Sequence, residues 1–486
     1  MIYYLILSFL TAIIVFLTYK IWEKTQELSF VIGFSILYYW TFYGCWFFIA
    51  DELTNREAGK FLGLYYYYLL EKMFMVKIDN FYSKMLLLYG LFFVCLQVTV
   101  YYFVKTNIRK IDMTNFKKIE INHLFLFLIS FFAIIISFYL ERKEIFTAIN
   151  KDISIYTITR SSNNPFYTLH KLLNIVGLAP LLFGFVIYLT GSTGKLFTGK
   201  KNIFIFFGYI LMILISELYM TMLGNKHELL FAGLFCTSMY LLNVQYKYSW
   251  RTIISYILII GVPLFFINKT RGYSLKEVLK HFKIQEKQMI PMDHHHEDDH
   301  EDDIISFNTT LSMLFNNEMF CASFSMYGAL SKDIPKTYGS SFVSLAASVV
   351  PSIFWPNRPK DIYSYYANQV GAKKGQGYTI HHATGWYLNF GIIGIIIGAI
   401  VLGWIWAACY NLLSRISDPP TVLYKTIFIL MANASLVAIL PQIVRAGPEA
   451  YKTLIFEAFA MPMLTIYFSS QGFLHMMIHQ IKSLTK

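Results

Sequence analysis

Residues 391–411 read GIIGIIIGAIVLGWIWAACYN and contain no charged side chain. A helix of about 20 apolar residues crosses the roughly 30 Å hydrocarbon core of a bilayer, and this stretch has that length and composition. Because a helix satisfies its backbone hydrogen bonds internally, it is the structure that such a stretch adopts in lipid. The stretch therefore predicts a transmembrane helix.

Comparable apolar runs on both sides of this stretch predict an all-α, polytopic integral membrane protein with about eleven transmembrane helices. The first run opens at the N-terminus without a basic segment or a cleavage site, so we expect it to be a retained span. The spans are expected at 2–19, 28–50, 82–104, 123–141, 172–190, 203–222, 229–243, 252–267, 391–411, 423–444 and 454–470.

These spans divide the chain into three parts. Residues 1–267 carry helices 1 to 8 with short loops, and residues 391–486 carry helices 9 to 11 with a cytoplasmic tail. Between them, residues 268–390 form one large hydrophilic region with short interfacial helices. Basic loops at 105–118, 195–201 and 247–251 fall on one face, which the positive-inside rule assigns to the cytoplasm. The N-terminus and the large region are then external.

The composition excludes an ordinary soluble domain, since 56% of the 486 residues are hydrophobic and only 14% are charged. The formal charge of +12 suits anionic lipid headgroups or a phosphorylated substrate. No basic soluble domain is present, so nucleic acid is not an expected partner. The five cysteines form no CxxC pattern, and the chain lacks a P-loop and a GxSxG motif.

Cationic residues recur at the expected external ends of the spans. Guanidinium groups at this depth bind phosphate oxygens bidentately, while a prenyl tail stays in the hydrocarbon. The alternative for each residue is simple snorkelling to lipid headgroups. The candidates for diphosphate binding are Arg160, Lys226 (next to His227), Arg271, Arg358 and Arg445.

Residues 377–391 form the densest polar and aromatic cluster of the external region. An imidazole of His381 or His382 has a pKa suited to accepting a proton from a hydroxyl group, so both are candidate catalytic residues. Trp386 and Tyr387 offer ring faces on which sugars stack. The alternative is an interfacial aromatic belt with incidental histidines.

Acidic residues supply further candidates. Glu318, in the external region, is a reserve general base, and Glu217 and Glu457 lie inside predicted spans, where a carboxylate is costly. An equally good interpretation is that Glu217 and Glu457 each pair with a neighbouring Lys, Arg or Tyr and serve helix packing. The tract 293–303 is rich in His, Asp and Glu but has no fixed ligand spacing, so we expect a solvated loop, no metal site and no cofactor.

Three local patterns carry a family resemblance: GNKHELL at 224–230, PSIFWPNRP at 351–359 and GWYLNFGIIG at 385–394. With the arrangement of spans, they make the chain similar to the O-antigen polymerases (Wzy type) and the related O-antigen ligases. The family usually carries Arg where this chain has Lys226. The family's essential arginines and histidine map most plausibly onto Arg160, Arg271, His382 and Arg445.

The resemblance implies a membrane glycosyltransferase with a fold similar to the GT-C type, in the bacterial inner membrane. It implies that a hydroxyl of one undecaprenyl-diphosphate-linked oligosaccharide repeat unit attacks the anomeric carbon of another, with inversion and without a metal. The arginines would stabilise the leaving diphosphate, and His382 or Glu318 would act on the acceptor hydroxyl. Membrane lipids and a chain-length regulator protein are the other implied partners. A ligase, which shares the donor, and a polysaccharide or lipid transporter (flippase) are the alternatives.

Overall fold

The computed structural model describes residues 2–43, 75–106, 121–155, 158, 166–191, 200–223, 226–243, 322–347, 350, 355, 361–371, 379–416 and 423–469. The regular elements of this part of the chain are all helices. An isolated parallel bridge joins Ile380 to Ala446. The predicted all-α fold is confirmed.

Six of the described helices are long and apolar enough to cross a bilayer. They are α1 (Ile2–Thr25), α5 (Asn80–Phe103), α6 (His123–Lys151), α8 (Tyr167–Gly191), α9 (Lys200–Met222) and α18 (His382–Leu412). Shorter apolar helices at Leu28–Phe42, Leu230–Met239 and Lys425–Ala438 fall on three further predicted spans. The predicted span 252–267 lies outside the described residues, so the count of about eleven stays a prediction.

The outer surfaces of the long helices are apolar. On α9 the exposed side chains include Phe204, Phe207, Leu211 and Leu218, which recur at the three- and four-residue spacings of one helix face. A helix on the surface of a soluble protein carries polar residues on that face. The exposed apolar stripe is therefore the face that contacts lipid.

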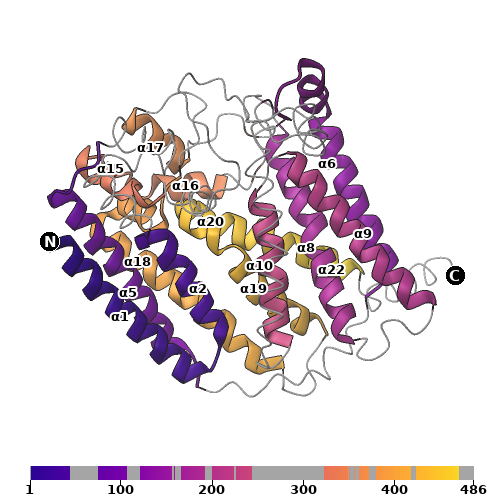
Figure 1. Ribbon diagram of the computed structural model, residues 1–486, viewed down its shortest axis with the longest axis horizontal. Helices are drawn as coiled ribbons and strands as arrows, with labels where there is room; N and C mark the ends of the chain where they lie inside the picture. The colour runs from indigo at the N-terminus through magenta and orange to yellow at the C-terminus, as the bar shows by residue number, and fades with distance from the viewer. Residues whose placement is uncertain are drawn as a thin grey trace, which may run out of the picture.

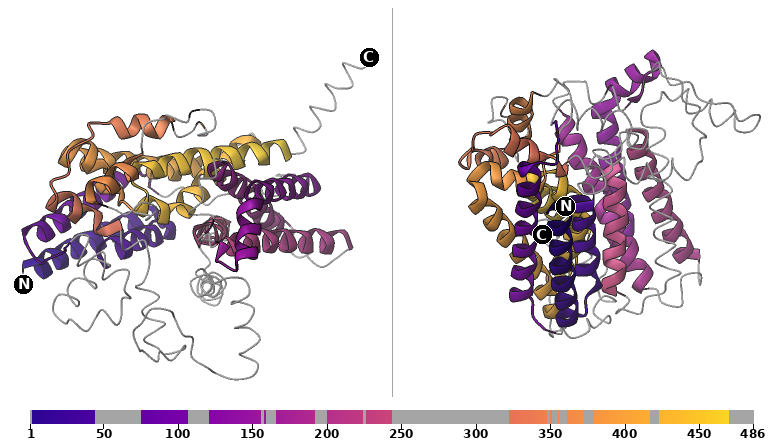
Figure 2. Two further views of the ribbon diagram at one scale, coloured as in Figure 1. Left: turned by 90° about the horizontal axis from the view of Figure 1, so that it is seen from above. Right: turned by 60° about the vertical axis from the view of Figure 1, so that its left-hand side comes forward.

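The helices form two groups (Figure 1). One contains α1, α5, α18 and α2 (Leu28–Tyr38), which continues as a π-helical segment, η1 (Tyr39–Tyr43). The other contains α6, α8, α9 and α10 (Lys226–Asn243). Within the first group α18 packs most closely on α5, and within the second α6 packs most closely on α8. Seen from above, the C-terminal helices run alongside both groups (Figure 2).

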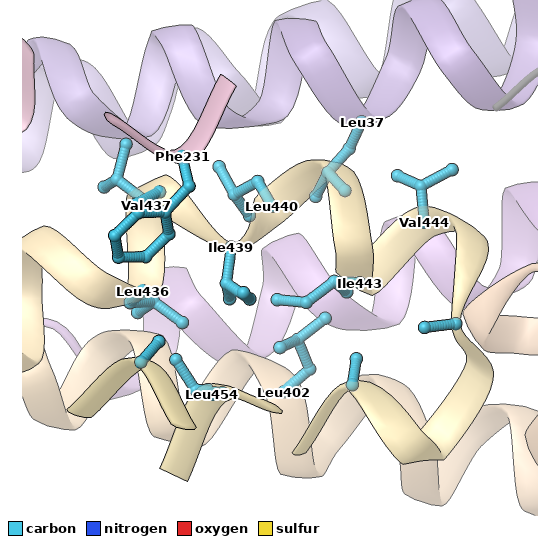
Figure 3. Packing of buried hydrophobic residues seen from close by; sticks show 14 of the residues in the cluster. Leu37, Phe231, Leu402, Leu436, Val437, Ile439, Leu440, Ile443, Val444 and Leu454 are labelled. Carbon is cyan, nitrogen blue, oxygen red and sulfur yellow. The ribbon is translucent and has the colours of Figure 1, made fainter. Parts of the chain in front are cut away.

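This C-terminal segment is a hairpin of broken helices: α19 (Leu423–Ala438), α20 (Leu440–Arg445), η5 (Gly447–Glu449), α21 (Ala450–Lys452), η6 (Thr453–Ala460) and α22 (Met461–Ser469). Pro441 explains the first break, because proline has no N–H and its ring clashes with the preceding turn. Figure 3 shows Ile439 and Leu440 at the break, between Leu37 of α2 and Leu402 of α18. The kinked segment is thereby buried in the centre of the molecule.

Three short helices, α15 (Ser325–Ser331), α16 (Ser340–Ala347) and α17 (Ile362–Val370), lie in the predicted external region. They gather at one end of the first helix group (Figure 1). The Tyr327 hydroxyl of α15 donates to Asp79 at the start of α5, at 2.9 Å. The short helices therefore cover the end at which α5 and α18 begin.

The helix predicted to start at residue 391 starts earlier, at His382, and breaks at Phe390 and Gly391. Gly391 has φ +64° and ψ −144°, a conformation that only glycine adopts readily. Hydropathy located the long half of α18 but not the polar, aromatic turns that precede the break. It is these first turns that carry the histidine pair. At its other end α18 closes in a short 3₁₀ turn, η4 (Leu413–Ile416).

Candidate functional site

His381 caps the start of α18. Its Nδ1 accepts a hydrogen bond from Ala383 N at 3.1 Å, so in the neutral ring the proton lies on Nε2, which donates to the Thr41 hydroxyl at 2.9 Å. Its backbone N–H donates to Ser325 Oγ at 3.1 Å. Burial first, and then the His382 ring, lower the pKa of His381 from 6.5 to about 3. His381 is thus a neutral residue that ties α18 to η1 and α15.

His382 is the opposite tautomer. Its Nδ1 lies 2.8 Å from the Gly447 carbonyl oxygen, which only accepts, so Nδ1 donates. Its Nε2 is then a lone-pair acceptor, which receives Trp386 Nε1–H at 3.2 Å and lies 3.0 Å from the Tyr451 hydroxyl. The ring is 1% exposed. His382 therefore offers a proton-accepting nitrogen whose direction is fixed by three neighbours.

The turn between α20 and η5 brings Arg445 to the histidine pair. Ile380 N donates to the Arg445 carbonyl at 3.1 Å, and Gly447 N donates to the Ile380 carbonyl at 2.9 Å. Gly447 has φ +53°, which glycine permits, and a Cβ at the facing Gly385 would lie 3.2 Å from Gly447 Cα, so the absence of a side chain at Gly385 permits the close approach. Two segments that the sequence singled out separately thus form one structural unit.

Helix α17 packs a tyrosine and an acid against this unit. The Tyr363 hydroxyl donates to the Arg445 carbonyl at 3.3 Å, and Glu449 Oε1 accepts from Ile362 N at 3.0 Å. Burial, followed by the Glu449 carboxylate, raises the pKa of Tyr363 well above its ordinary value, and the Arg445 guanidinium opposes this shift. The half-buried Arg445 side chain therefore sits in a neighbourhood that contains both a phenol and a carboxylate.

The two aromatic candidates have different surroundings. Trp386 is 6% exposed, with Phe342 of α16 at a ring-centroid distance of 4.8 Å and Gly398 directly beside the indole. Tyr387 is half-buried, with Lys336 Nζ 3.6 Å from its ring centroid. Burial lowers the pKa of Lys336. A sugar would reach the Trp386 face only after Phe342 moved, so the stacking role of both rings stays a prediction.

Several predicted site residues are not placed by the structure. Arg160, Arg271, Arg358 and Glu318 lie outside the described residues, as does the tract 293–303. Lys226 is the first residue of α10, but its side chain is not among those described. Within the described part of the chain, no three His, Cys, Asp or Glu side chains are grouped to hold a metal.

The two acids inside predicted spans are placed. Glu217 is a half-buried residue of α9, and Glu457 of η6 forms an ion pair with Lys452 at 3.3 Å. The two partners of that pair are five residues apart, a spacing that the π-helical turn brings to one face. Glu457 is therefore paired with a lysine for packing, which is the alternative that the sequence left open beside a functional carboxylate.

Sequence reasoning missed Tyr451 and Tyr363, which contact His382 and Arg445. The signal available for Tyr451 was the sequence Gly447-Pro448 directly after a span, which is typical of a turn and places the next residues at the same membrane end. Nothing local to Tyr363 indicates its position.

Comparison with protein-family models, with curated proteins and with solved structures found no match. The chemistry of the site therefore follows from its residues alone. A fixed imidazole lone pair, a tyrosine hydroxyl and an arginine backbone meet at one end of a membrane-embedded helix bundle. The imidazole can accept a proton from a hydroxyl group, and the Arg445 side chain, a guanidinium, can attract an anion.

Proposed function

We propose that the protein is a polymerase of undecaprenyl-diphosphate-linked oligosaccharide repeat units, such as those of O-antigen, capsule or exopolysaccharide. The observation that carries the proposal is the direct contact between the start of α18 and the α20–η5 turn, which joins His382 to Gly447 and Ile380 to Arg445. The reaction needs a proton acceptor and a cation for a lipid diphosphate, both at membrane-surface depth. This junction supplies both residue types at one end of the bundle.

In the proposed reaction, a hydroxyl oxygen of the acceptor sugar forms a bond with the anomeric carbon of the donor. The bond from that carbon to the diphosphate oxygen breaks, and undecaprenyl diphosphate leaves with the electron pair. The hydroxyl proton passes to His382 Nε2 by way of the Tyr451 hydroxyl, which lies 3.0 Å from it. Arg445 stabilises the charge that develops on the diphosphate. Glu318 remains the reserve proton acceptor.

We place the protein in the bacterial inner membrane, with the site on the outer face and a chain-length regulator as a further partner. A ligase and a transporter are the competing functions. A ligase would transfer the glycan to lipid A core or to protein, whereas a transporter would move its substrate without forming a bond. The position of the polar residues at one end of the bundle favours an enzyme over a transporter. The resemblance covers O-antigen polymerases and ligases alike, so the product of the reaction decides between those two.

The test is conversion of purified lipid-linked repeat units by the protein in nanodiscs. We expect the wild-type protein to form a ladder of products. The polymerisation rate of His382→Ala should be at least about a hundredfold lower, because a positioned acid or base contributes about 10²–10⁴ in rate. His123→Ala is the matched control, since His123 also bonds a tyrosine, Tyr209 at 2.8 Å, but at the opposite end of the bundle. Arg445→Ala is paired with Arg142→Ala, whose guanidinium is exposed against Tyr139.

Tyr451→Phe separates the proton route from packing. It removes one hydroxyl but keeps the ring beside His382 and leaves the bonds of His382 to Gly447 and Trp386 in place. We expect slower polymerisation in a protein that elutes and melts as the wild type does. A fully active Tyr451→Phe variant rules out the route through this hydroxyl. Single transfers to lipid A would indicate a ligase, and movement without bond formation a transporter.

A further inference from the structure

Helix α16 covers the aromatic side of the site. Its Phe342 ring packs on Trp386, with the centroids 4.8 Å apart and the planes tilted by 55°, and on Phe390, nearly parallel at 6.0 Å. On its other side the indole of Trp386 meets Gly398, where a Cβ would fall within 2.4 Å of the ring. Trp386 is therefore enclosed between the long half of α18 and α16.

The ring of Phe342 occupies a position suited to a sugar. Aromatic faces pack against the apolar face of a ring of similar size, and the indole N–H of Trp386 donates to His382 Nε2, 3.2 Å away. A sugar in place of Phe342 would thus contact the indole that donates to the proton-accepting nitrogen. Phe342 is itself half-buried, so it is within reach of the surface.

Hydrogen bonds tie the start of α16 to α18, and the helix also packs on η5. Ser341 Oγ and Thr337 Oγ1 each donate to Asn389 Oδ1 at 2.8 Å, and Thr337 N donates to the Leu388 carbonyl at 2.8 Å. These acceptors belong to the end of the first half of α18, directly before the break at Phe390 and Gly391. The outward residue Val343 is 60% exposed.

A pair of left-handed residues precedes α16. Tyr338 has φ +47° and Gly339 has φ +87°, and Tyr338 is 82% exposed. A non-glycine residue in this region is strained, and such strain gathers at switch segments and ligand clamps. The two residues provide a pivot between the Thr337 anchor and the helix.

We propose that α16 is a lid whose Phe342 ring covers Trp386, and that the helix swings about Tyr338 and Gly339 to admit a sugar ring of the substrate. The inference rests on the proposed function for the identity of the ligand. It explains why a predicted stacking residue is buried. In the closed state the lid is autoinhibitory, and substrate replaces Phe342 on the indole.

The first arm of the test locks the lid. In S341C/N389C the two cysteines replace side chains whose polar atoms are 2.8 Å apart. The oxidised, cross-linked protein should polymerise repeat units at least about tenfold more slowly than the reduced protein, and dithiothreitol should restore the rate. The single variants S341C and N389C, treated with the same oxidant, are the controls. A cross-linked protein as active as the reduced one overturns the lid.

The second arm needs no activity. Ser341 is 6% exposed and Val343 is 60% exposed, although they lie two residues apart on α16. A water-soluble maleimide should label V343C at once and S341C at least about tenfold more slowly, after subtraction of wild-type labelling. Adding Phe342→Ala to S341C should speed the labelling of the cysteine at position 341 about tenfold, because it removes the packing of the Phe342 ring on Trp386 and Phe390. Unchanged slow labelling would overturn the lid even in an active enzyme.

The two arms separate the lid from the proposed function. Wild-type protein that fails to polymerise repeat units, together with fast labelling of the S341C/F342A protein, contradicts the polymerase and supports the lid. A polymerase whose S341C label does not respond to Phe342→Ala contradicts the lid alone.

Discussion

At the scale of single residues, the site depends on hydrogen bonds that decide which nitrogen carries a proton. His381 accepts at Nδ1 and His382 donates at Nδ1, although they are neighbours in the chain. The partners that impose this difference are the backbone of α18 for one ring and the Gly447 carbonyl for the other. Sequence could nominate both histidines but could not assign their roles, because Gly447 and Tyr451 are 65 and 69 positions from His382.

Glu27 provides a test of burial at a distance from this site. It lies in the turn between α1 and α2, is 0% exposed, and its Oε2 has no hydrogen-bond partner among the described residues. Burial raises the pKa of Glu27 from 4.5 to about 7, opposed by the hydrogen bonds from Ser29. Because the folded-state pKa is raised, the contribution of Glu27 to the stability is greatest below pH 4.5 and is lost as the pH rises through about 7.

We therefore expect Glu27→Gln to melt at a higher temperature than the wild type at pH 8 and at a similar temperature near pH 4. The difference at pH 8 should be about 3 kcal/mol, since each pKa unit corresponds to about 1.4 kcal/mol. Thermal unfolding in detergent across this pH range measures it. Glu23→Gln, an exposed acid on α1, is the control. An equal gain at every pH would contradict the assignment of the loss to ionisation of Glu27.

At the scale of elements, breaks in helices position the site. The break in α18 turns its first half back so that Trp386 packs beside Gly398, and Pro441 kinks the path from α19 into α20. Hydropathy predicted the start of a span at residue 391, which is the break, because only the long half of α18 is uniformly apolar. The mixed polar and aromatic composition of the first half hid its helical structure.

Gly391→Ala tests the break in α18. No atom lies within 4 Å of a Cβ at this position, so the cost comes from backbone strain at φ +64° and not from a clash. We expect a loss of about 1–3 kcal/mol in unfolding free energy, measured by denaturation in mixed micelles. Ile392→Ala, at an exposed position next to it, is the control. Equal stability of Gly391→Ala and wild type would show that the break tolerates a side chain.

At the scale of the whole molecule, apolar run length predicted most of what the structure shows. The expected spans 82–104 and 203–222 correspond to α5 (Asn80–Phe103) and α9 (Lys200–Met222) within two or three residues at each end. The length of an apolar run does not indicate which helices pack side by side, because it contains no information on the neighbour that a helix contacts. The contact between α18 and the C-terminal hairpin is of this kind.

The same limit applies to the candidate site as a set. His381, His382 and Arg445 were predicted to lie on one membrane face, with Trp386 as a sugar-stacking residue of the histidine segment. The structure brings these four residues into one unit. Arg160, Arg271, Arg358 and Glu318 lie outside the described residues, so their part in the site stays a prediction. The closing role of α16 was not visible in the sequence, since it depends on a ring from a different segment filling the face of Trp386.

The most direct test of the central claim is to measure undecaprenyl diphosphate release alongside product length for the wild-type protein in nanodiscs. Polymerisation forms one glycosidic bond for each undecaprenyl diphosphate that leaves, so the amount released should equal the number of new glycosidic bonds in the ladder. Intact lipid-linked repeat units after incubation with folded protein, with no undecaprenyl diphosphate released, would contradict the account.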